Sequence, residues 1–145
     1  MTTYLPAGLP APTPAPDGLD AAYWEAAAEH RLVVQRCGGC GRHQWGPEWI
    51  CHRCRSFDLG WADVEPTGVI YSWERVWHPV HAALPEACPY VVVLVELPHA
   101  DGVRMVGNLL GDATDPVVIG APVEAVFEDH DGDPPYTLVQ WRRTL

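Results

Sequence analysis

The sequence predicts a mostly β protein, in which a short N-terminal helix and a small cysteine-bearing ribbon precede a five-stranded barrel of the OB type. Three observations support this fold class. Two C-x-x-C pairs are separated by ten residues, which suits a compact ribbon. Five β-rich segments follow, and the first is long enough to bend across a small barrel. The 145 residues leave room for one domain with a small module attached.

The charge balance limits the classes of partner. The net charge is −10 and the isoelectric point is near 4.9, so the chain lacks the basic surface that a non-specific nucleic-acid binder needs. The chain has no lysine, and five of its arginines lie in or beside the cysteine segment: Arg31, Arg36, Arg42, Arg53 and Arg55. This local basic character indicates either solvated side chains or a contact with an anion such as a phosphate.

Residues 1–19 are rich in proline, which predicts an extended arm without a core of its own. Such an arm is either disordered or laid along a partner. A short helix is expected over residues 20–31, with Asp20 as its N-cap and Tyr23 and Trp24 at helical spacing with alanines. Because so short a helix is marginal alone, it must pack on the ribbon, on the barrel or on a partner chain.

Residues 32–60 are expected to form the ribbon. Cys37, Cys40, Cys51 and Cys54 offer four thiolates from two tight turns and complete a tetrahedral sulfur shell. No position is left for water or substrate, so the metal is structural. Zinc is the first choice, and iron in a redox ribbon is the alternative. A site of this kind stabilises a fold by on the order of 10 kcal/mol or more.

Two segments of the ribbon are expected to bring the ligands together. Leu32–Val34 begins a strand that leads to the first pair, where two glycines suit the tight turn. His43–Ile50 returns to the second pair. Trp45 and Trp49 on this returning segment either shield the metal or form a platform for a planar group.

The pattern of cysteine use favours a reducing compartment, because four of the five cysteines belong to the two pairs. Cys88 is expected to be a packed residue or a spectator thiol, since no activating histidine is evident near it. No basic segment followed by an apolar one opens the chain, and no apolar run reaches membrane-spanning length. We therefore expect a cytoplasmic protein without a membrane partner.

Residues 61–145 are expected to form the OB-fold domain. Gly68 is interpreted as a bulge or bend at the start of a long strand, and Gly107 as a point of close approach. The near-continuous apolar run of the second strand predicts burial on both of its faces. The expected strands are Val69–Trp77, Tyr90–Leu97, Val103–Leu110, Pro122–Glu128 and Tyr136–Arg143.

Two polar clusters lie in the connections of this domain. His78 and His81, in a proline-rich loop, are interpreted as part of a loop over a shared channel, a weak metal pair or a solvated loop. The acidic turn from Glu128 to Asp133, with His130, is expected to be solvated, with a cation site as the alternative. The chain offers no paired carboxylates in a plausible pocket, no Ser or Cys beside a base and no phosphate-cradling glycine loop, so no catalytic residue is expected.

Several runs resemble one known family in their order along the chain. Tyr23–Glu25 and Leu32–Gly41 resemble the opening of the acyl-CoA-associated zinc-ribbon/OB-fold family, the domain-of-unknown-function 35 family. The later runs of the resemblance, which covers about residues 20–143, are Gly68–Trp73, Pro89–Leu97 and Phe127–Asp129. The resemblance implies an N-terminal helix, a rubredoxin-like zinc ribbon with the four cysteines as ligands, and an OB barrel.

The resemblance also implies a role. Members of this family are non-catalytic subunits beside thiolase-fold enzymes, where they help to shape the acyl-CoA channel. The implied partner is a thiolase-fold protein of the thiolase or aldolase type, in a heterotetramer of two plus two chains. Retro-aldol cleavage of a steroid side-chain CoA ester is an attractive subtype. On this hypothesis acyl-CoA is a ligand shared with the partner, and the candidate CoA contacts are Arg42, Trp45, Trp49, Arg53 and Arg55.

The alternative function is a single-stranded nucleic-acid-binding OB module. Tyr71, Trp73 and Trp77 of the long strand would then stack on bases. The acidic net charge and the absence of lysine oppose this reading.

Overall fold

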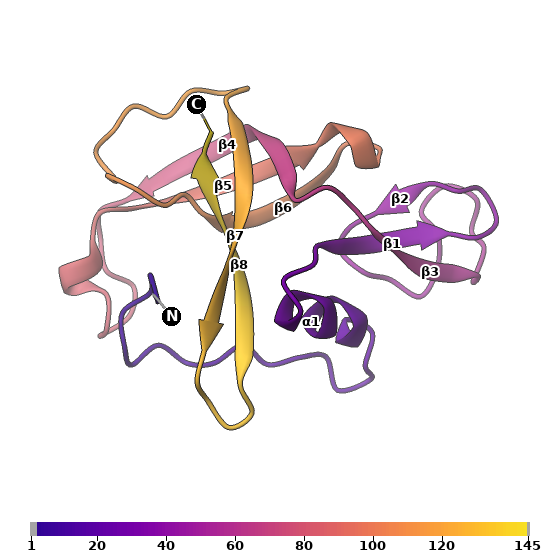
Figure 1. Ribbon diagram of the computed structural model, residues 1–145, viewed down its shortest axis with the longest axis horizontal. Coiled ribbons are helices and arrows are strands. Elements are labelled where there is room, and N and C mark those ends of the chain that lie inside the picture. Colours follow the sequence, from indigo (N-terminus) through magenta and orange to yellow (C-terminus); the bar gives the residue numbers. More distant parts are fainter. Residues whose placement is uncertain (1–2, 145) are drawn as a thin grey trace.

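The computed structural model describes residues 3–144 and contains two antiparallel sheets (Figure 1). The first has three strands in the order β2-β1-β3, and the second has five in the order β6-β5-β4-β7-β8. The predicted fold class is confirmed, with one α-helix among the described residues, then the ribbon, then a nearly closed barrel. The elements are α1 (Ala21–Ala28), β1 (Val33–Cys37), β2 (His43–Gln44), β3 (Leu59–Asp63), β4 (Thr67–Val76), η1 (Pro85–Ala87), β5 (Tyr90–Leu97), η2 (Pro98–Ala100), β6 (Val103–Asn108), β7 (Pro122–His130) and β8 (Tyr136–Arg143).

Helix α1 starts where the sequence predicts, but the side chain of its N-cap residue does not bond to the helix. Asp20 occupies the N-cap position without a side-chain hydrogen bond to the helix amides. Its carboxylate instead accepts bonds from the Ala15 amide at 3.0 Å and the Trp24 indole N–H at 3.1 Å. The ring of Tyr23 contacts that of Trp24 at a centroid distance of 5.2 Å and packs on Trp45 at 4.8 Å. Tertiary contacts therefore hold this short helix. Within residues 3–144 no helix is long and apolar enough to cross a membrane.

The ribbon sheet is built around β1. Strand β3 pairs with β1 along its whole length, from Val33 opposite Asp63 to Cys37 opposite Leu59. The boundary predicted at residue 60 thus falls inside a ribbon strand. The return over His43–Ile50 is extended only at β2, and the six residues after Gln44 form an irregular loop, so the predicted return is correct in direction but not in regularity.

The long strand β4 bends across the barrel, but its bulge is not at the predicted glycine. The register with β5 shifts between Ile70 and Ser72. Gly68 has a different function, because a Cβ there would lie 2.6 Å from the Glu96 carbonyl oxygen and 2.6 Å from Val95 Cγ1. The glycine therefore permits close approach of β4 to β5, and the bulge supplies the bend.

Strand β5 is buried on one face only, so the prediction of burial on both faces is wrong. Its odd-numbered residues from Val91 to Leu97 are buried, and its even-numbered residues are partly exposed. An antiparallel sheet commonly packs one face on the core and leaves the other to solvent. Here the outer face carries Val106 of β6, which lies opposite Leu94 and is 69% exposed.

The barrel closes where β6 meets β8. Gly107 is the predicted point of close approach, and the structure confirms it. A Cβ on this residue would lie 2.6 Å from Cδ1 and 2.8 Å from Nε1 of the fully buried Trp141. Just beyond β6, Leu109 bridges Trp141, and the Leu110 amide donates to the Trp141 carbonyl at 2.7 Å.

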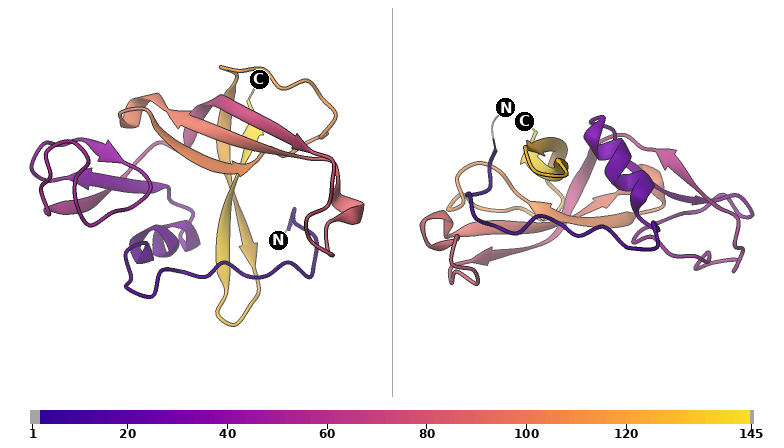
Figure 2. Two further views of the ribbon diagram at one scale, coloured as in Figure 1. Left: turned by 180° about the vertical axis from the view of Figure 1, so that it is seen from behind. Right: turned by 90° about the horizontal axis from the view of Figure 1, so that it is seen from below.

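The β7–β8 hairpin is covered on both of its faces. On one face His30, just after α1, stacks on Phe127 at a centroid distance of 5.2 Å. On the other face lies the N-terminal arm, which runs from the loop around η1 across the hairpin to α1 (Figures 1 and 2). Residues 3–19 are thus laid along this chain's own barrel rather than separated from it.

Candidate functional site

The two C-x-x-C pairs form two knuckles with the same backbone hydrogen bonds. In each, the N–H of the first cysteine, Cys37 or Cys51, donates to the carbonyl five residues later at 2.9 Å. In return, the cysteine's carbonyl accepts from the N–H four residues later, at 2.8 Å for Cys37 and 3.0 Å for Cys51. The residues that donate back, Gly41 and Arg55, are both left-handed, with φ of 75° and 64°. The residue that must be left-handed is thus the one directly after the second cysteine of each pair. Gly38 has a different function, because a side chain there would collide with the Asp58 carboxylate.

The four sulfurs converge on a single point. Cys37 Sγ lies 3.5 Å from Cys54 Sγ, Cys40 Sγ lies 3.7 Å from Cys51 Sγ, and all four lie within 4.8 Å of one another. A tetrahedral zinc with Zn–S bonds of about 2.3 Å requires sulfurs about 3.8 Å apart, so the donor set and its spacing suit zinc. With four protein ligands the site is closed, and the zinc that it holds is structural.

Main-chain N–H groups donate hydrogen bonds to the two buried sulfurs. Gly39 donates to Cys37 Sγ at 3.3 Å, and Arg53 donates to Cys51 Sγ at 3.4 Å. The Cys40 N–H chiefly lowers the pKa of Cys37, and the Cys54 and Arg53 N–H groups lower the pKa of Cys51 to about 6. Since zinc binds thiolates, these amides favour the form of the cysteine that coordinates the metal.

Two buried glutamines hold the irregular loop that carries Cys51. Gln44 Nε2 donates to Gln35 Oε1 at 2.9 Å. Gln35 also accepts from the Glu48 amide and donates to its carbonyl, both at 3.0 Å, and Gln44 accepts from the His52 amide at 3.0 Å. These side chains take the place of strand partners, which is why the loop is ordered without a ladder. A lone glutamine in a sequence carries no signal of this arrangement.

The candidate CoA contacts separate into two groups. Arg42 and Trp45 line a hollow of about 270 Å³ between ribbon and barrel, together with His52, Asp101 and Arg104. The His43 amide and Nδ1 hold Asp101 at 2.8 and 2.9 Å, and this contact ties the ribbon to the barrel and lowers the pKa of Asp101. The other candidates, which do not line this hollow, are the exposed ribbon residues Trp49, Arg53 and Arg55.

The two tryptophans also differ in their surroundings. Trp45 packs between Tyr23 and Trp61, at centroid distances of 4.8 and 6.4 Å, whereas Trp49 is 58% exposed. Trp45 is thus part of the contact between α1 and the ribbon. The platform for a planar group and the CoA contacts stay predictions.

The predicted channel loop borders a cavity, but through residues other than its histidines. His78 and His81 are exposed, and His81 Nδ1 accepts from the Ala83 amide at 3.1 Å. Further along the same loop, Leu84 and Ala87 line an apolar cavity of about 390 Å³ between the loop, the N-terminal arm and the end of β6.

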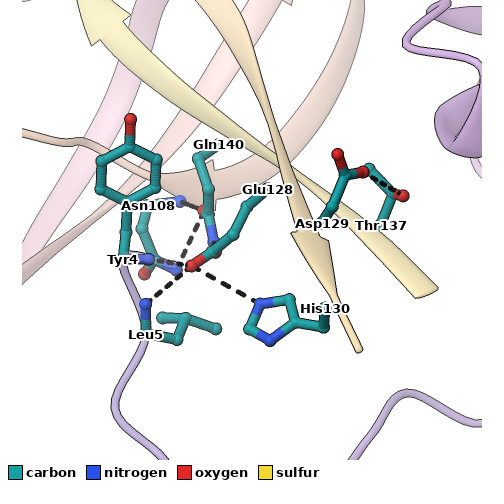
Figure 3. Close-up of polar contacts among 8 residues, drawn as sticks. All are labelled: Tyr4, Leu5, Asn108, Glu128, Asp129, His130, Thr137 and Gln140. Atoms are coloured by element: carbon teal, nitrogen blue, oxygen red, sulfur yellow. Dashed lines mark hydrogen bonds and ion pairs between the residues drawn. The ribbon is translucent and has the colours of Figure 1, made fainter. Parts of the chain in front are cut away.

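Sequence reasoning missed a buried carboxylate in the acidic turn. Glu128 is fully buried, so the expectation of a solvated turn is wrong for this residue. Its Oε2 accepts from the Leu5 amide at 2.8 Å and also from the Tyr4 amide, and its Oε1 accepts from Gln140 Nε2 at 2.8 Å (Figure 3). His130 Nε2, at 3.5 Å from Oε2, is near enough for an ion pair when protonated but makes no hydrogen bond.

The neighbouring Asp129 points to the opposite face of the hairpin, as Figure 3 shows. It accepts from the Thr137 hydroxyl at 2.7 Å and from His30 Nε2 at 2.8 Å. The Thr137 bond chiefly, and then His30, lower the pKa of Asp129. Two adjacent acidic residues thus bind the arm (Glu128) and His30, just after α1 (Asp129), one on each face of the hairpin. The alternation of a strand predicts two faces here, but not what covers them.

Comparison with known proteins identifies both parts of the chain. The family model described as "ChsH2, rubredoxin-like zinc ribbon domain" matches residues 24–60, and "ChsH2, C-terminal OB-fold domain" matches residues 61–128. A chain of the solved structure "Ltp2-ChsH2(DUF35) aldolase" is 39% identical with a TM-score of 0.77, and the match covers 92% of this chain and 100% of that one. A DUF35 protein from Sulfolobus solfataricus, 14% identical with a TM-score of 0.59, shares the fold.

Three relatives carry functional names. A "Probable enoyl-CoA hydratase alpha subunit" of Thermomonospora curvata is 43% identical over 90% of this chain. A "3-oxo-4,17-pregnadiene-20-carboxyl-CoA hydratase alpha subunit" of Mycobacterium tuberculosis is 31% identical over 95% of this chain. The chain spans only 39% and 45% of the lengths of these two relatives. It spans 72% of a "DUF35 domain-containing scaffold protein" of Methanocaldococcus jannaschii, which is 30% identical over 70% of this chain.

Proposed function

Because the chain belongs to the ChsH2-type zinc-ribbon/OB-fold family, the DUF35 family, we propose that it is a non-catalytic, zinc-stabilised subunit of a heteromeric enzyme that acts on an acyl-CoA thioester. The partner is a thiolase-fold protein of the aldolase type, which performs the carbon–carbon bond chemistry. The assembly has two copies of each chain. The substrate is a β-hydroxyacyl-CoA, with a steroid side-chain ester as the first candidate.

The observation that carries this proposal is the match to a complete chain of the Ltp2-ChsH2(DUF35) aldolase, at 39% identity. That protein is by its name a complex of two components, and this chain spans all of the component that it matches. The closed zinc site agrees with a supporting role, since a metal with four protein ligands has no open position for a substrate. The nucleic-acid alternative is not favoured, because the net charge is −10 and the relatives carry CoA-related or scaffold names.

A second candidate activity is the hydration of an enoyl-CoA. The names of the T. curvata and M. tuberculosis relatives support it, since both are hydratase alpha subunits. On this reading the chain supplies the part that those relatives share with it, and a partner supplies the hydratase fold. The two candidates differ in the chemistry of the partner and not in the role of this chain.

Co-expression with a thiolase-fold candidate partner and with a hydratase-fold candidate tests both readings. We expect the thiolase-fold protein to co-purify, to become more soluble, and to release a cleaved ketone or aldehyde from a β-hydroxyacyl-CoA. Hydration of an enoyl-CoA by the other complex alone would replace the first candidate by the second. Turnover of either thioester by this chain alone would overturn the subunit role.

The contact with CoA is a separate part of the proposal. Arg42 in the hollow between ribbon and barrel and Arg53 on the exposed ribbon are proposed to meet the phosphates of CoA. Replacing both by alanine should weaken acyl-CoA binding by the complex at least tenfold. The control is Arg142→Ala, because this arginine pairs with Glu124 at the opposite sheet edge. Unchanged affinity in the double variant would exclude this contact.

A further inference from the structure

A buried polar cluster holds the start of the N-terminal arm, which forms one wall of the apolar cavity beside the end of β6. The Glu128 carboxylate has no exposed surface, and it accepts the main-chain N–H groups of two successive arm residues, Tyr4 and Leu5 (Figure 3). Gln140 donates to its other oxygen at 2.8 Å and itself accepts from the Asn108 amide at 3.0 Å. One chain of hydrogen bonds therefore connects the arm, the hairpin and β6. We call Glu128 with its donors the anchor.

The anchor holds the arm only while Glu128 is ionised. Each of its hydrogen-bond partners among the described residues is an N–H donor, so a protonated carboxyl group would direct its own O–H at one of them. A buried carboxylate is also costly unless its surroundings favour the charge. The arm supplies no charged side chain for this purpose, because residues 3–16 contain none. The hold on the arm therefore depends on whatever else stabilises the ionised carboxylate.

His130 is placed to do so. It lies two residues after Glu128 on β7, hence on the same face of the strand, and its Nε2 is 3.5 Å from Glu128 Oε2. This nitrogen is buried and makes no hydrogen bond to any described residue, which is rare in native proteins. The ring stacks on Tyr136 at a centroid distance of 4.7 Å. Since two arm amides already occupy the lone pairs of Oε2, His130 acts on the carboxylate through its charge rather than through a hydrogen bond.

The other groups around the imidazole are acidic or neutral. On its own strand the neighbouring Asp129 points to the opposite face of the hairpin (Figure 3). On β8 it faces the phenol ring of Tyr136. Towards the arm, His130 and the exposed Asp131 line a hollow of about 500 Å³, whose lining includes no arginine. A positive charge on His130 is therefore attracted by Glu128 without a competing cation in this hollow.

We propose that His130 makes the arm a pH-sensitive strap: protonation of the imidazole stabilises the ionised anchor, so the arm is held more tightly as the pH falls from 8 to 6. Histidine is the side chain that ordinarily changes its charge in this range, whereas carboxylates ordinarily stay ionised throughout it. The closed arm keeps water from the two opposite charges and so strengthens their attraction. By linkage, proton uptake and closure of the arm favour each other. This inference does not depend on the identity of the partner.

Amide hydrogen exchange of the zinc-loaded full chain, followed by NMR at pH 8 and pH 6, tests the strap. The protection factor divides the intrinsic exchange rate by the measured rate, so the direct effect of pH on exchange cancels. We expect protection at Tyr4 and Leu5 to be roughly threefold or more higher at pH 6. Ala15 is the internal control, because Asp20 accepts its amide at 3.0 Å and that carboxylate's other partner is an indole, which does not titrate. Protection at Ala15 should stay constant.

Two histidine variants assign the effect. His130→Gln removes the charge and keeps a polar side chain, so protection at Tyr4 and Leu5 should no longer change with pH; if this variant does not fold, His130→Phe keeps the stack on Tyr136 and replaces it. His30→Gln is the matched control, because His30 contacts Asp129 on the opposite face of the hairpin, and it should retain the rise. Wild-type protection that stays constant or falls towards pH 6, a rise of equal size at Ala15, or a rise that survives removal of the His130 imidazole would overturn the inference.

Discussion

Gly107→Ala tests the closure of the barrel, on which the wall of the cavity depends. The new methyl group would lie 2.6 Å from Trp141 Cδ1, 2.8 Å from its Nε1 and 3.1 Å from the Val139 carbonyl oxygen. Carbon atoms in contact normally lie about 3.5–4.0 Å apart, so β6 or the indole must move by roughly 1 Å. Trp141 is fully buried and its neighbours are core residues, so neither side can yield freely. Overpacking of this kind costs about 1–3 kcal/mol.

The assay is urea unfolding of the zinc-loaded protein, followed by tryptophan fluorescence. A loss of about 1–3 kcal/mol corresponds to a fall of the urea midpoint by on the order of 1 M. Because a chain of this size loses about 2–4 °C in Tm per kcal/mol, the melting temperature should fall by about 2–12 °C. Gly60→Ala is the matched control, since the nearest atom to its Cβ would be the Arg36 carbonyl oxygen at an ordinary 3.8 Å.

A double variant assigns the cost to the contact with the indole. Trp141→Phe alone should destabilise the core by leaving a cavity, and Gly107→Ala alone by crowding it. In the double variant the smaller ring should leave room for the methyl group. Its loss of unfolding free energy should therefore be smaller than the sum of the losses in the two single variants. Strict additivity, or a Gly107→Ala variant as stable as the wild type, would refute the reasoning that close approach of β6 to Trp141 closes the barrel.

Two other predictions concern the metal and the hairpin. Removal of zinc by a chelator, or the substitution Cys51→Ser, should abolish hydrogen-exchange protection in the ribbon and leave that of β5 unchanged. The control is Cys88→Ser, which should keep the metal because Cys88 is not one of the four ligands. A ribbon that stays protected in the metal-free protein would contradict a structural role. Because Thr137 chiefly, and then His30, lower the pKa of Asp129, its carboxylate stabilises the fold above about pH 4 and loses this effect as the pH falls through the lowered pKa. Urea midpoints of Asp129→Asn should therefore lie below wild type at pH 7 and converge with it at strongly acidic pH, and a gap that stays constant with pH would exclude this linkage.

The metal centre could be predicted from the sequence because its chemistry is local. Each pair of cysteines lies within one turn, so spacing alone brings two sulfurs together, and only thiolates in that number suit a closed zinc site. The five strands of the barrel were equally accessible in their order along the chain, since each strand is marked by its own apolar pattern. The irregular loop before Cys51 was not, because two buried glutamines replace the strand pairing that the pattern suggested.

The cavity and its anchor could not be predicted, because they join residues that are far apart in the chain. Glu128 and Leu5 are separated by 123 positions, and nothing in an acidic turn or a proline-rich arm indicates that one covers the other. A carboxylate near the end of a strand is ordinarily solvated, and here the arm removes it from water. The two histidines of the loop are candidates from the sequence because histidine is a common functional residue. Leu84 and Ala87, which line the cavity, cannot be told from any other apolar loop residues.

The sequence by itself therefore determined the zinc ligands, the class of fold and the order of its elements, since these follow from side-chain chemistry and periodicity within a few residues. Only the tertiary structure decided that the arm lies on the β7–β8 hairpin, that one of two adjacent acidic residues is buried, and where an apolar cavity opens. The physical reason is that burial is a property of whichever segment folds over a residue, and a side chain does not encode its distant neighbours.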